Sequence, residues 1–209
     1  AKTKNSQTVT YAPDNQPASI TLAEGAVNFT YDSLRRTTAI ESAGGNMGYG
    51  YDAYSRLTTV TDSNTSQTVT YAYDSLGRRS SMTAAGRTVA YAYDRLSRLS
   101  TVQQTGETSP ATYCYDAAGR RVSLTLPNGV ATAYAYNDAG QLADLHSTKP
   151  DNSTLARFTY TLDATGNRTA IAQNLNDTVN NLVYTFDNAY RLTGELRTDN
   201  GRQARHRHH

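Results

Sequence analysis

The sequence predicts an all-β fold built from tandem antiparallel β-hairpins. An aromatic-x-aromatic-Asp unit, as in Tyr71-Ala72-Tyr73-Asp74, recurs along almost the whole chain. The Asp or Asn of this unit stands at positions 32, 52, 74, 94, 116, 137, 163 and 187, in steps of 20 to 26 residues. A recurring period of this size is the signature of a repeat protein. Helix is disfavoured, because Gly, Pro or Asn interrupts every window with apolar residues at helical spacing.

Each unit begins with an expected strand whose two rings share one face. Successive side chains of a strand point to opposite faces, so Val69, Tyr71 and Tyr73 lie on one side of the strand and Thr70 and Ala72 on the other. The chain contains 16 Tyr but only 3 Phe and no Trp. Tyrosine is a large ring with a polar tip, so we expect it to supply most of the apolar burial in a sheet that is wet on one side.

A turn is expected directly after the aromatic pair. Its fullest form is Asp-x-x-Gly-Arg, at positions 74–78 and 116–120. Asp suits the first position of a type I turn, and a Gly three residues later supplies the positive φ of a G1 bulge. Some units replace this Gly, and there we expect the same conformation with more strain; the replacements are Arg35, Ser55, Ser97 and Tyr190. A Thr- and Val-bearing segment such as Leu57–Val60 then forms the second strand.

Asp and Arg stand four residues apart in six units, which allows two interpretations. The pairs are 32/36, 52/56, 74/78, 94/98, 116/120 and 187/191. They could be acid/base or ligand-binding pairs. Alternatively, Asp shapes the turn and Arg covers the aromatic face or pairs with the Asp of a neighbouring unit. We favour the structural interpretation, because a catalytic constellation is needed once and this one is built six times. We therefore predict no catalytic, cofactor-binding or metal-binding residues and no cofactor.

The repeats divide the chain into three parts. Residues 1–25 are interpreted as a degenerate first repeat, in which Pro13 replaces the second ring and Pro17 lies in the turn. Residues 26–197 are tandem repeats, with polar inserts at 149–154 and 173–178 that predict longer loops. Residues 198–209 form a polar tail that we expect to be disordered or not native. The first residue is Ala1 rather than Met, so we expect the natural N-terminus to lie upstream.

Other candidate residues receive structural or incidental interpretations. Cys114 occupies the slot between two rings that Ala, Gly or Thr fills elsewhere, so a small structural residue is favoured over a nucleophile. His146 stands alone in a polar setting, and the basic tail 202–209 could bind a metal or an acidic surface but is predicted to be disordered. Five Asn-x-Ser/Thr sites are interpreted as chance products of a Thr- and Asn-rich chain; they are Asn28, Asn64, Asn152, Asn167 and Asn176.

Composition predicts neither a nucleic-acid partner nor a membrane-spanning helix. The net charge of +2 does not predict a nucleic-acid partner, and the 17 Arg are high in number because Arg belongs to the repeat. The chain has no run of eighteen apolar residues, so no membrane-spanning helix is predicted.

Tyr-x-Tyr-Asp-x-x-Gly-Arg followed by a short Leu/Val strand resembles the YD repeat of Rhs-type proteins, over roughly residues 26–197. That family includes bacterial polymorphic toxins, the cocoon-forming subunits of insecticidal toxin complexes, and teneurins. The resemblance implies a curved, spiralling ribbon of hairpins that forms part of a hollow shell around a toxin cargo. It implies as partners that cargo or the rest of the shell, and a secreted or cell-surface location in bacteria. The family's self-cleavage element contains Asp-Pro, and this chain has no Asp-Pro dipeptide, so autoproteolysis does not carry over.

Three functions follow from the sequence. The first is a non-enzymatic wall segment of such a shell; eight hairpins at ~4.8 Å per strand span roughly 75 Å, enough for a trough but not for a container. The second is a carbohydrate- or cell-surface-binding module with exposed tyrosine ladders, which substitutions such as Tyr51→Ala or Tyr93→Ala would test. The third and least favoured is a carbohydrate-processing enzyme that uses two repeat aspartates, Asp74 among them.

Overall fold

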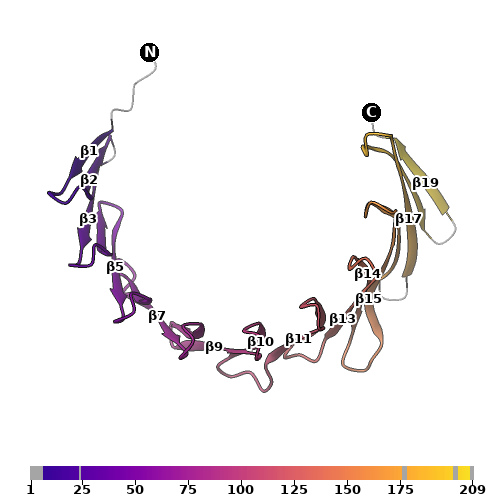
Figure 1. The fold of residues 1–209 in the computed structure, drawn as a ribbon, viewed down its shortest axis with the longest axis horizontal. Helices are drawn as coiled ribbons and strands as arrows, with labels where there is room; N and C mark the ends of the chain where they lie inside the picture. The colour runs from indigo at the N-terminus through magenta and orange to yellow at the C-terminus, as the bar shows by residue number, and fades with distance from the viewer. Residues whose placement is uncertain (1–6, 24, 176–177, 200–201, 208–209) are drawn as a thin grey trace, which may run out of the picture. The chain divides into compact units, whose positions relative to one another are not determined.

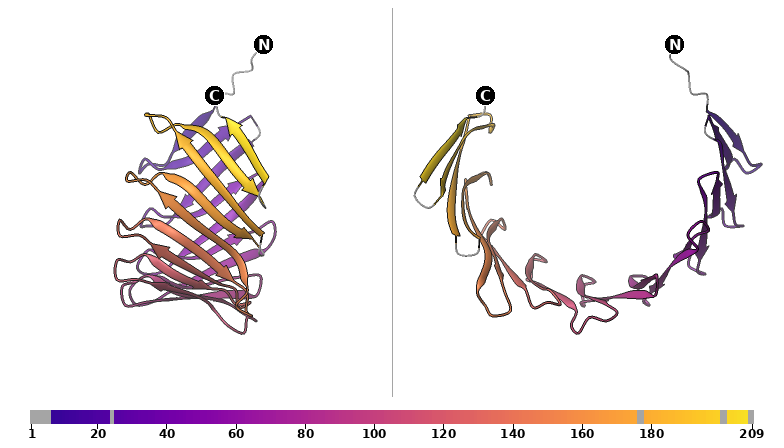
Figure 2. Two further views of the ribbon diagram at one scale, coloured as in Figure 1. Left: turned by 90° about the vertical axis from the view of Figure 1, so that its right-hand side faces the viewer. Right: turned by 180° about the vertical axis from the view of Figure 1, so that it is seen from behind.

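The computed structural model describes residues 7–23, 25–175, 178–199 and 202–207. These residues form β-strands and turns, with no helix among them. The chain divides into two compact units, Ala1–Tyr91 and Ala92–His209. Within each unit the strands lie side by side in a single curved layer (Figures 1 and 2). The prediction of an all-β fold of antiparallel hairpins is confirmed.

In the first unit, strands that follow one another in sequence pair antiparallel. The strands are β1 (Thr8–Tyr11), β2 (Pro17–Leu22), β3 (Gly25–Tyr31), β4 (Thr37–Ser42), β5 (Gly45–Tyr51), β6 (Leu57–Asp62), β7 (Gln67–Tyr73), β8 (Arg79–Ala84) and β9 (Arg87–Tyr93), whose last two residues belong to the second unit.

The second unit forms the same kind of meander from β10 to β19. Its strands are β10 (Leu99–Gln104), β11 (Ala111–Tyr115), β12 (Arg121–Thr125), β13 (Ala131–Tyr136), β14 (Leu142–Thr148), β15 (Thr154–Leu162), β16 (Arg168–Leu175), β17 (Thr178–Phe186), β18 (Leu192–Asp199) and β19 (Arg202–Arg207).

The turns have the predicted geometry. At Asp74, the amide of Gly77 donates to the Asp74 carbonyl (3.0 Å) and the amide of Asp74 donates to the Arg78 carbonyl (2.8 Å). The pairing register then shifts by one residue between Ala72 and Tyr73, which is the bulge. Gly77 has φ 79°. The residues that replace this Gly adopt the same positive φ, as predicted; the values are 64° at Arg35, 63° at Ser55, 61° at Ser97 and 58° at Tyr190.

Side chains alternate along the strands, but neither unit has a conventional core. On β7, Val69, Tyr71 and Tyr73 are half-buried, whereas Thr70 and Ala72 are exposed. This confirms that the rings share one face. Among the described residues only Ala111 and Asn180 are buried, and no large side chain is fully buried. A single layer of sheet has no opposing layer, so each strand depends on contacts with the strands beside it.

The degenerate first repeat is a hairpin with a frame different from the predicted one. Its turn runs from Ala12 to Gln16, and Asn15 (φ 65°) stands where Gly77 stands in the regular unit. Tyr11 therefore occupies the second-ring position, Pro13 lies in the turn, and Pro17 begins β2. The sequence misleads here because Asp14 suggests the start of the turn, whereas the structure places Ala12 there.

Two other expectations differ from the structure. The first polar insert does not form a long loop, because residues 149–153 make a tight turn. In the second insert Gln173 continues β16 and Thr178 begins β17, while residues 176–177 lie outside the described residues; β15 and β16 reach 9 and 8 residues. The polar tail contains a strand, because β19 pairs with β18: Gly194 lies opposite Arg207 at one end of the pairing and Asp199 lies opposite Arg202 at the other. An open sheet edge offers unpaired backbone groups even to a polar sequence.

Candidate functional site

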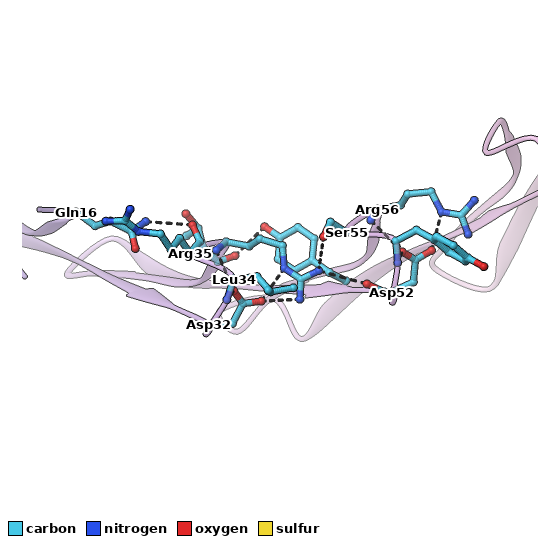
Figure 3. Close-up of polar contacts among 11 residues, drawn as sticks. Gln16, Asp32, Leu34, Arg35, Asp52, Ser55 and Arg56 are labelled. Carbon is cyan, nitrogen blue, oxygen red and sulfur yellow. Dashed lines mark hydrogen bonds and ion pairs between the residues drawn. The ribbon is translucent and has the colours of Figure 1, made fainter. Parts of the chain in front are cut away.

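The most regular polar feature is a carboxylate that organises each turn. At Asp32, one carboxylate oxygen accepts hydrogen bonds from the amides of Leu34 and Arg36, both at 2.9 Å. The other accepts from the Arg36 Nε at 2.7 Å. The same three contacts recur at Asp52 and Asp74. The Asp therefore shapes the turn and fixes the Arg side chain at its end (Figure 3).

These contacts lower the carboxylate pKa values. The amide of Arg36, followed by its guanidinium, holds the pKa of Asp32 below its ordinary value. At Asp163 the side-chain amide of Asn167 and the hydroxyl of Thr165 lower the pKa to about 2. Hydrogen bonds to the ionised form favour that form. The hydrogen bonds of the turn therefore favour the ionised form of these aspartates.

The Arg side chain connects its own turn to the next unit. The Arg36 guanidinium lies over the Tyr51 ring, 4.7 Å from the ring centroid. Its Nη1 donates to the Asp52 carbonyl (3.2 Å) and the Ser55 hydroxyl (3.1 Å). The Tyr51 hydroxyl donates back to the carbonyl of Thr37, the residue after Arg36, at 2.8 Å. We call this set of contacts a turn joint (Figure 3).

The joint is repeated along the chain. Arg56 lies 4.6 Å from the Tyr73 ring centroid, and the Tyr73 hydroxyl donates to the Leu57 carbonyl at 2.7 Å. Two further joints show both the ring contact and the hydroxyl bond: Arg98–Tyr115 (4.6 and 2.9 Å) and Arg120–Tyr136 (4.6 and 2.9 Å).

The structural interpretation of the Asp–Arg spacing is confirmed, with one correction. Arg covers an aromatic ring, as expected. Its ion pair, however, is with the Asp of its own turn, for example 2.7 Å between Arg56 and Asp52. The contact with the neighbouring Asp is to the backbone carbonyl. The reason is geometric: the carboxylate is already engaged by the turn amides and faces its own Arg.

Two joints in the second unit lack the Arg guanidinium and the phenol. Asn137 and Gln141 form an amide pair (2.8 Å), and the ring position of the following unit is Leu162. Asp163 pairs with Asn167 (2.9 Å), and the following ring is Phe186. An open hollow of about 460 Å³ lies beside the second of these joints, lined by Gly166, Asn167, Arg168, Ile171, Tyr184, Phe186 and Leu192.

The sequence contains a signal for the joint that residue-by-residue interpretation missed. Wherever the Arg is replaced after the first repeat, the second ring of the next unit loses its hydroxyl: Gln141 precedes Leu162, and Asn167 precedes Phe186. This paired loss indicates that the two residues contact each other. A comparison of the repeats with one another could therefore have linked the two positions, whereas the geometry of the contact comes from the structure.

The first ring of several units is also covered. Arg79 lies 4.5 Å from the Tyr71 centroid, and Arg121 lies 4.6 Å from the Tyr134 centroid. The most exposed tyrosines in the described part of the chain are Tyr11, Tyr54 and Tyr190, which come from different positions of the repeat. They do not form the exposed ladder that the carbohydrate-binding alternative requires. Tyr51, named for its test, has its ring under Arg36 and its hydroxyl bonded.

The remaining candidate residues stand apart from one another. Cys114 is exposed on β11 opposite Ser123. His146, on β14, has its Nε2 3.1 Å from the Thr154 hydroxyl. Residues 7–23, 25–175, 178–199 and 202–207 contain no group of three or more His, Cys, Asp or Glu that could hold a metal ion. Over the same residues there is no helix of sufficient length and apolarity to cross a membrane.

Comparison with known proteins identifies the repeat. The family model described as Teneurin YD-shell matches residues 23–202. Among solved structures, a chain of the TcdB2–TccC3 complex is 17% identical over 92% of this chain with a TM-score of 0.56. A chain of the TcdB2–TccC3–TEV complex is 17% identical over 91% with a TM-score of 0.54. This chain spans 14% of the length of each. No curated protein sequence matches.

Proposed function

The chain belongs to the teneurin YD-shell family, and on this basis we propose that it is a non-enzymatic wall segment of a YD-repeat shell that encloses or shields a toxin cargo. The single observation that supports this proposal most is that the repeated polar residues bind neighbouring hairpins to one another. Asp–Arg pairs that are followed by a Tyr in the next unit join neighbouring hairpins, as at Arg36, Tyr51 and Asp52.

A wall function needs many equivalent contacts, whereas catalysis needs one set of side chains that differs from its siblings. The turn aspartates have lowered pKa values because turn amides and Arg or Asn side chains bond to them. Such groups stabilise structure at neutral pH but do not exchange protons there. This supports a structural role and argues against the repeat aspartates as acid/base catalysts.

The proposed partners are the cargo and the remaining wall of the shell. The matched chains in the TcdB2–TccC3 complexes are much longer, since this chain spans 14% of each. A single layer with no large buried side chain among its described residues also suits a wall whose faces meet other protein. We propose a secreted or cell-surface location in bacteria, in keeping with the toxin-associated members of the family.

The proposal is tested by a protection assay. A reduced and carboxymethylated model protein with a fluorescent label, which stays unfolded, is mixed with the chain and treated with chymotrypsin. We expect its cleavage to be slowed several-fold in the presence of folded chain. The control is a folded globular protein of similar size carrying the same label, whose cleavage should be unaffected. Equal cleavage of the unfolded probe with and without the chain would contradict the shielding function.

A further inference from the structure

One turn of the second unit keeps its carboxylate but has no Arg beside it. The Asp163 carboxylate accepts hydrogen bonds from the backbone amide and hydroxyl of Thr165, at 2.9 and 2.7 Å. It also accepts from the backbone amide and the side-chain nitrogen of Asn167, both at 2.9 Å. In a regular turn one of the donors is a guanidinium, as at Asp52, where the Arg56 Nε lies 2.7 Å away. The four neutral donors leave the negative charge of Asp163 unbalanced within its own turn.

The following unit keeps an aromatic ring at the position that an Arg covers in a regular joint. That ring is Phe186, the counterpart of Tyr73, whose centroid lies 4.6 Å from the Arg56 guanidinium. Asn167 stands in the place of Arg56, but its side-chain nitrogen is directed back to the carboxylate of its own turn. The two groups that hold a guanidinium in a regular joint, a carboxylate and a ring, are thus both present here.

The open hollow of about 460 Å³ lies at this place. Asn167 and Phe186, the counterparts of the Arg and the ring of a joint, both line it. The side chains of Ile171 and Leu192 add an apolar part to its wall. A hollow of this size can admit a long side chain together with part of the backbone that carries it.

Arg168 also lines the hollow, but its charge is directed elsewhere. Its guanidinium lies 4.4 Å from the centroid of Tyr160 on β15, whereas Phe186 is on β17, and β16 lies between these two strands. The fold also accepts two such cations in succession, because Arg120 and Arg121 each cover a ring of the following unit at 4.6 Å. Arg168 therefore leaves the hollow open to a second guanidinium.

The other joint without an Arg does not offer the same groups. Its turn begins with Asn137, which carries no charge, and the ring position of the following unit is Leu162. A guanidinium would find neither a carboxylate nor an aromatic ring there. The combination of Asp163 and Phe186 is therefore particular to one joint and is not a general result of losing the Arg.

We propose that this hollow binds an arginine side chain of the enclosed protein, which takes the place of the missing joint Arg. The incoming guanidinium lies over the Phe186 ring and faces the Asp163 carboxylate, whose oxygens can accept further hydrogen bonds. It donates to the Asp187 carbonyl, the contact that a regular joint Arg makes with the next turn. The apolar wall contacts the aliphatic stem. The identity of the partner rests on the proposed shielding function, whereas the chemistry of the site does not.

The site is tested by NMR spectroscopy, because the chain contains only three Phe. In protein labelled with ring-¹³C phenylalanine, Phe186 reports on the hollow, and Phe29 and Phe158 are internal references. Nα-acetylarginine methylamide, added at constant ionic strength, should shift the Phe186 signals saturably, with a Kd in roughly the millimolar range. The reference signals should not move. The matched probe is Nα-acetylcitrulline methylamide, which has a similar shape without the charge and should bind at least tenfold more weakly.

Two variants copy residues that other turns of the chain already contain. Asn167→Arg fills the hollow from within the chain and should abolish the shift at Phe186. Asp163→Asn, which copies Asn137, should weaken binding of the arginine probe at least tenfold. Circular dichroism checks that both variants are folded. The matched control is Gln141→Arg, which places a guanidinium at the other joint and should leave the titration unchanged.

Several outcomes would overturn the proposal. They are no saturable change at Phe186, equal shifts with the citrulline probe, shifts of all three Phe, and an unaltered titration in Asn167→Arg. The titration uses small probes and a local signal, and it involves no unfolded protein. A failure here is therefore distinguishable from a failure of the chymotrypsin protection assay, which tests shielding itself.

Discussion

The joints of the first unit and those at Gln141 and Asn167 hold neighbouring hairpins in different ways. At Arg36 and Arg56 a charged side chain covers a ring and reaches the next turn, and the strands have six or seven residues. At Gln141 and Asn167 the guanidinium and the phenol are absent, and strands β15 to β18 have eight or nine residues. Longer backbone ladders thus accompany weaker joints. Side-chain joints and strand length are alternative ways to stabilise a single-layer sheet.

Acid should have the largest effect, because it acts on many joints at once. The turn aspartates have pKa values lowered in the folded state, first by the Arg36 amide at Asp32 and by the Asn167 amide at Asp163. A carboxylate whose pKa is lowered in the folded state stabilises the protein at any pH above its pKa in the unfolded state, about 3.9. That stability is lost as the pH falls through the pKa of the folded state. We expect unfolding, followed by circular dichroism, to begin below pH ~4 and to continue toward the value of about 2 at Asp163.

The comparison sharpens this expectation. The turn at Asn137 has no carboxylate at its first position and cannot titrate there. Hydrogen exchange at pH 3 should therefore show opening in the first unit, around Asp32 and Asp52, before the hairpin of β13 and β14. Simultaneous exposure of both regions would show that the turn carboxylates do not set the order.

Tyr73→Ala should be the most damaging single substitution. It removes a ring covered by Arg56 and the hydroxyl bond to the Leu57 carbonyl, and we expect a loss of about 2–4 kcal/mol in the free energy of unfolding. Urea denaturation measures this. The control is Leu76→Ala at the tip of the same hairpin, 70% exposed, which should change stability by less than ~0.5 kcal/mol. A comparable loss at both positions would argue against the joint.

Arg56→Ala should cost about 1–2 kcal/mol, since it removes the cation–π contact, the ion pair with Asp52 and the bond to the Asp74 carbonyl. Gln141→Ala at a weak joint should cost less, about 0.5–1 kcal/mol, because only neutral hydrogen bonds are lost. Equal losses in thermal denaturation would mean that the charged joint is no stronger than the neutral one.

A regular joint built into the weak region gives the reverse experiment. The triple variant Asn137→Asp, Gln141→Arg, Leu162→Tyr supplies the carboxylate, the guanidinium and the ring together. We expect about 1 kcal/mol of added stability. Gln141→Arg alone, which lacks a ring and a charged partner, should add little. Non-additivity in this set, measured by urea denaturation, would demonstrate the coupling directly.

The smallest effect should come from relieving backbone strain. Tyr190 has φ 58° in the turn position that Gly fills elsewhere, and its ring is 60% exposed. Tyr190→Gly should raise stability by about 0.5–1 kcal/mol. The reverse substitution, Gly119→Ala at φ 82°, should lower stability by a similar amount. The melting temperatures of the two variants should therefore shift in opposite directions.

The sequence alone determined the repeat, the strands and the turns. The two rings of Tyr-x-Tyr lie on one face only if the chain is extended, and Asp-x-x-Gly is typical of a tight turn with a positive φ at Gly. The strands and the turns therefore both follow from local covalent geometry. The same logic anticipated the strained φ values at Ser55 and Tyr190. It failed at Asp14 in the degenerate first repeat, because this Asp lies two residues after Ala12, where the turn begins.

The tertiary structure decided which residues meet across units. No local rule places the Arg36 guanidinium over Tyr51 or directs the Tyr51 hydroxyl to the Thr37 carbonyl, because these contacts depend on the pairing of β4 with β5. The same holds for the 80% exposure of Arg191 and for the strand formed by Arg202–Arg207. Side chains reach partners that only the register of neighbouring strands brings near, and register is a property of the whole sheet.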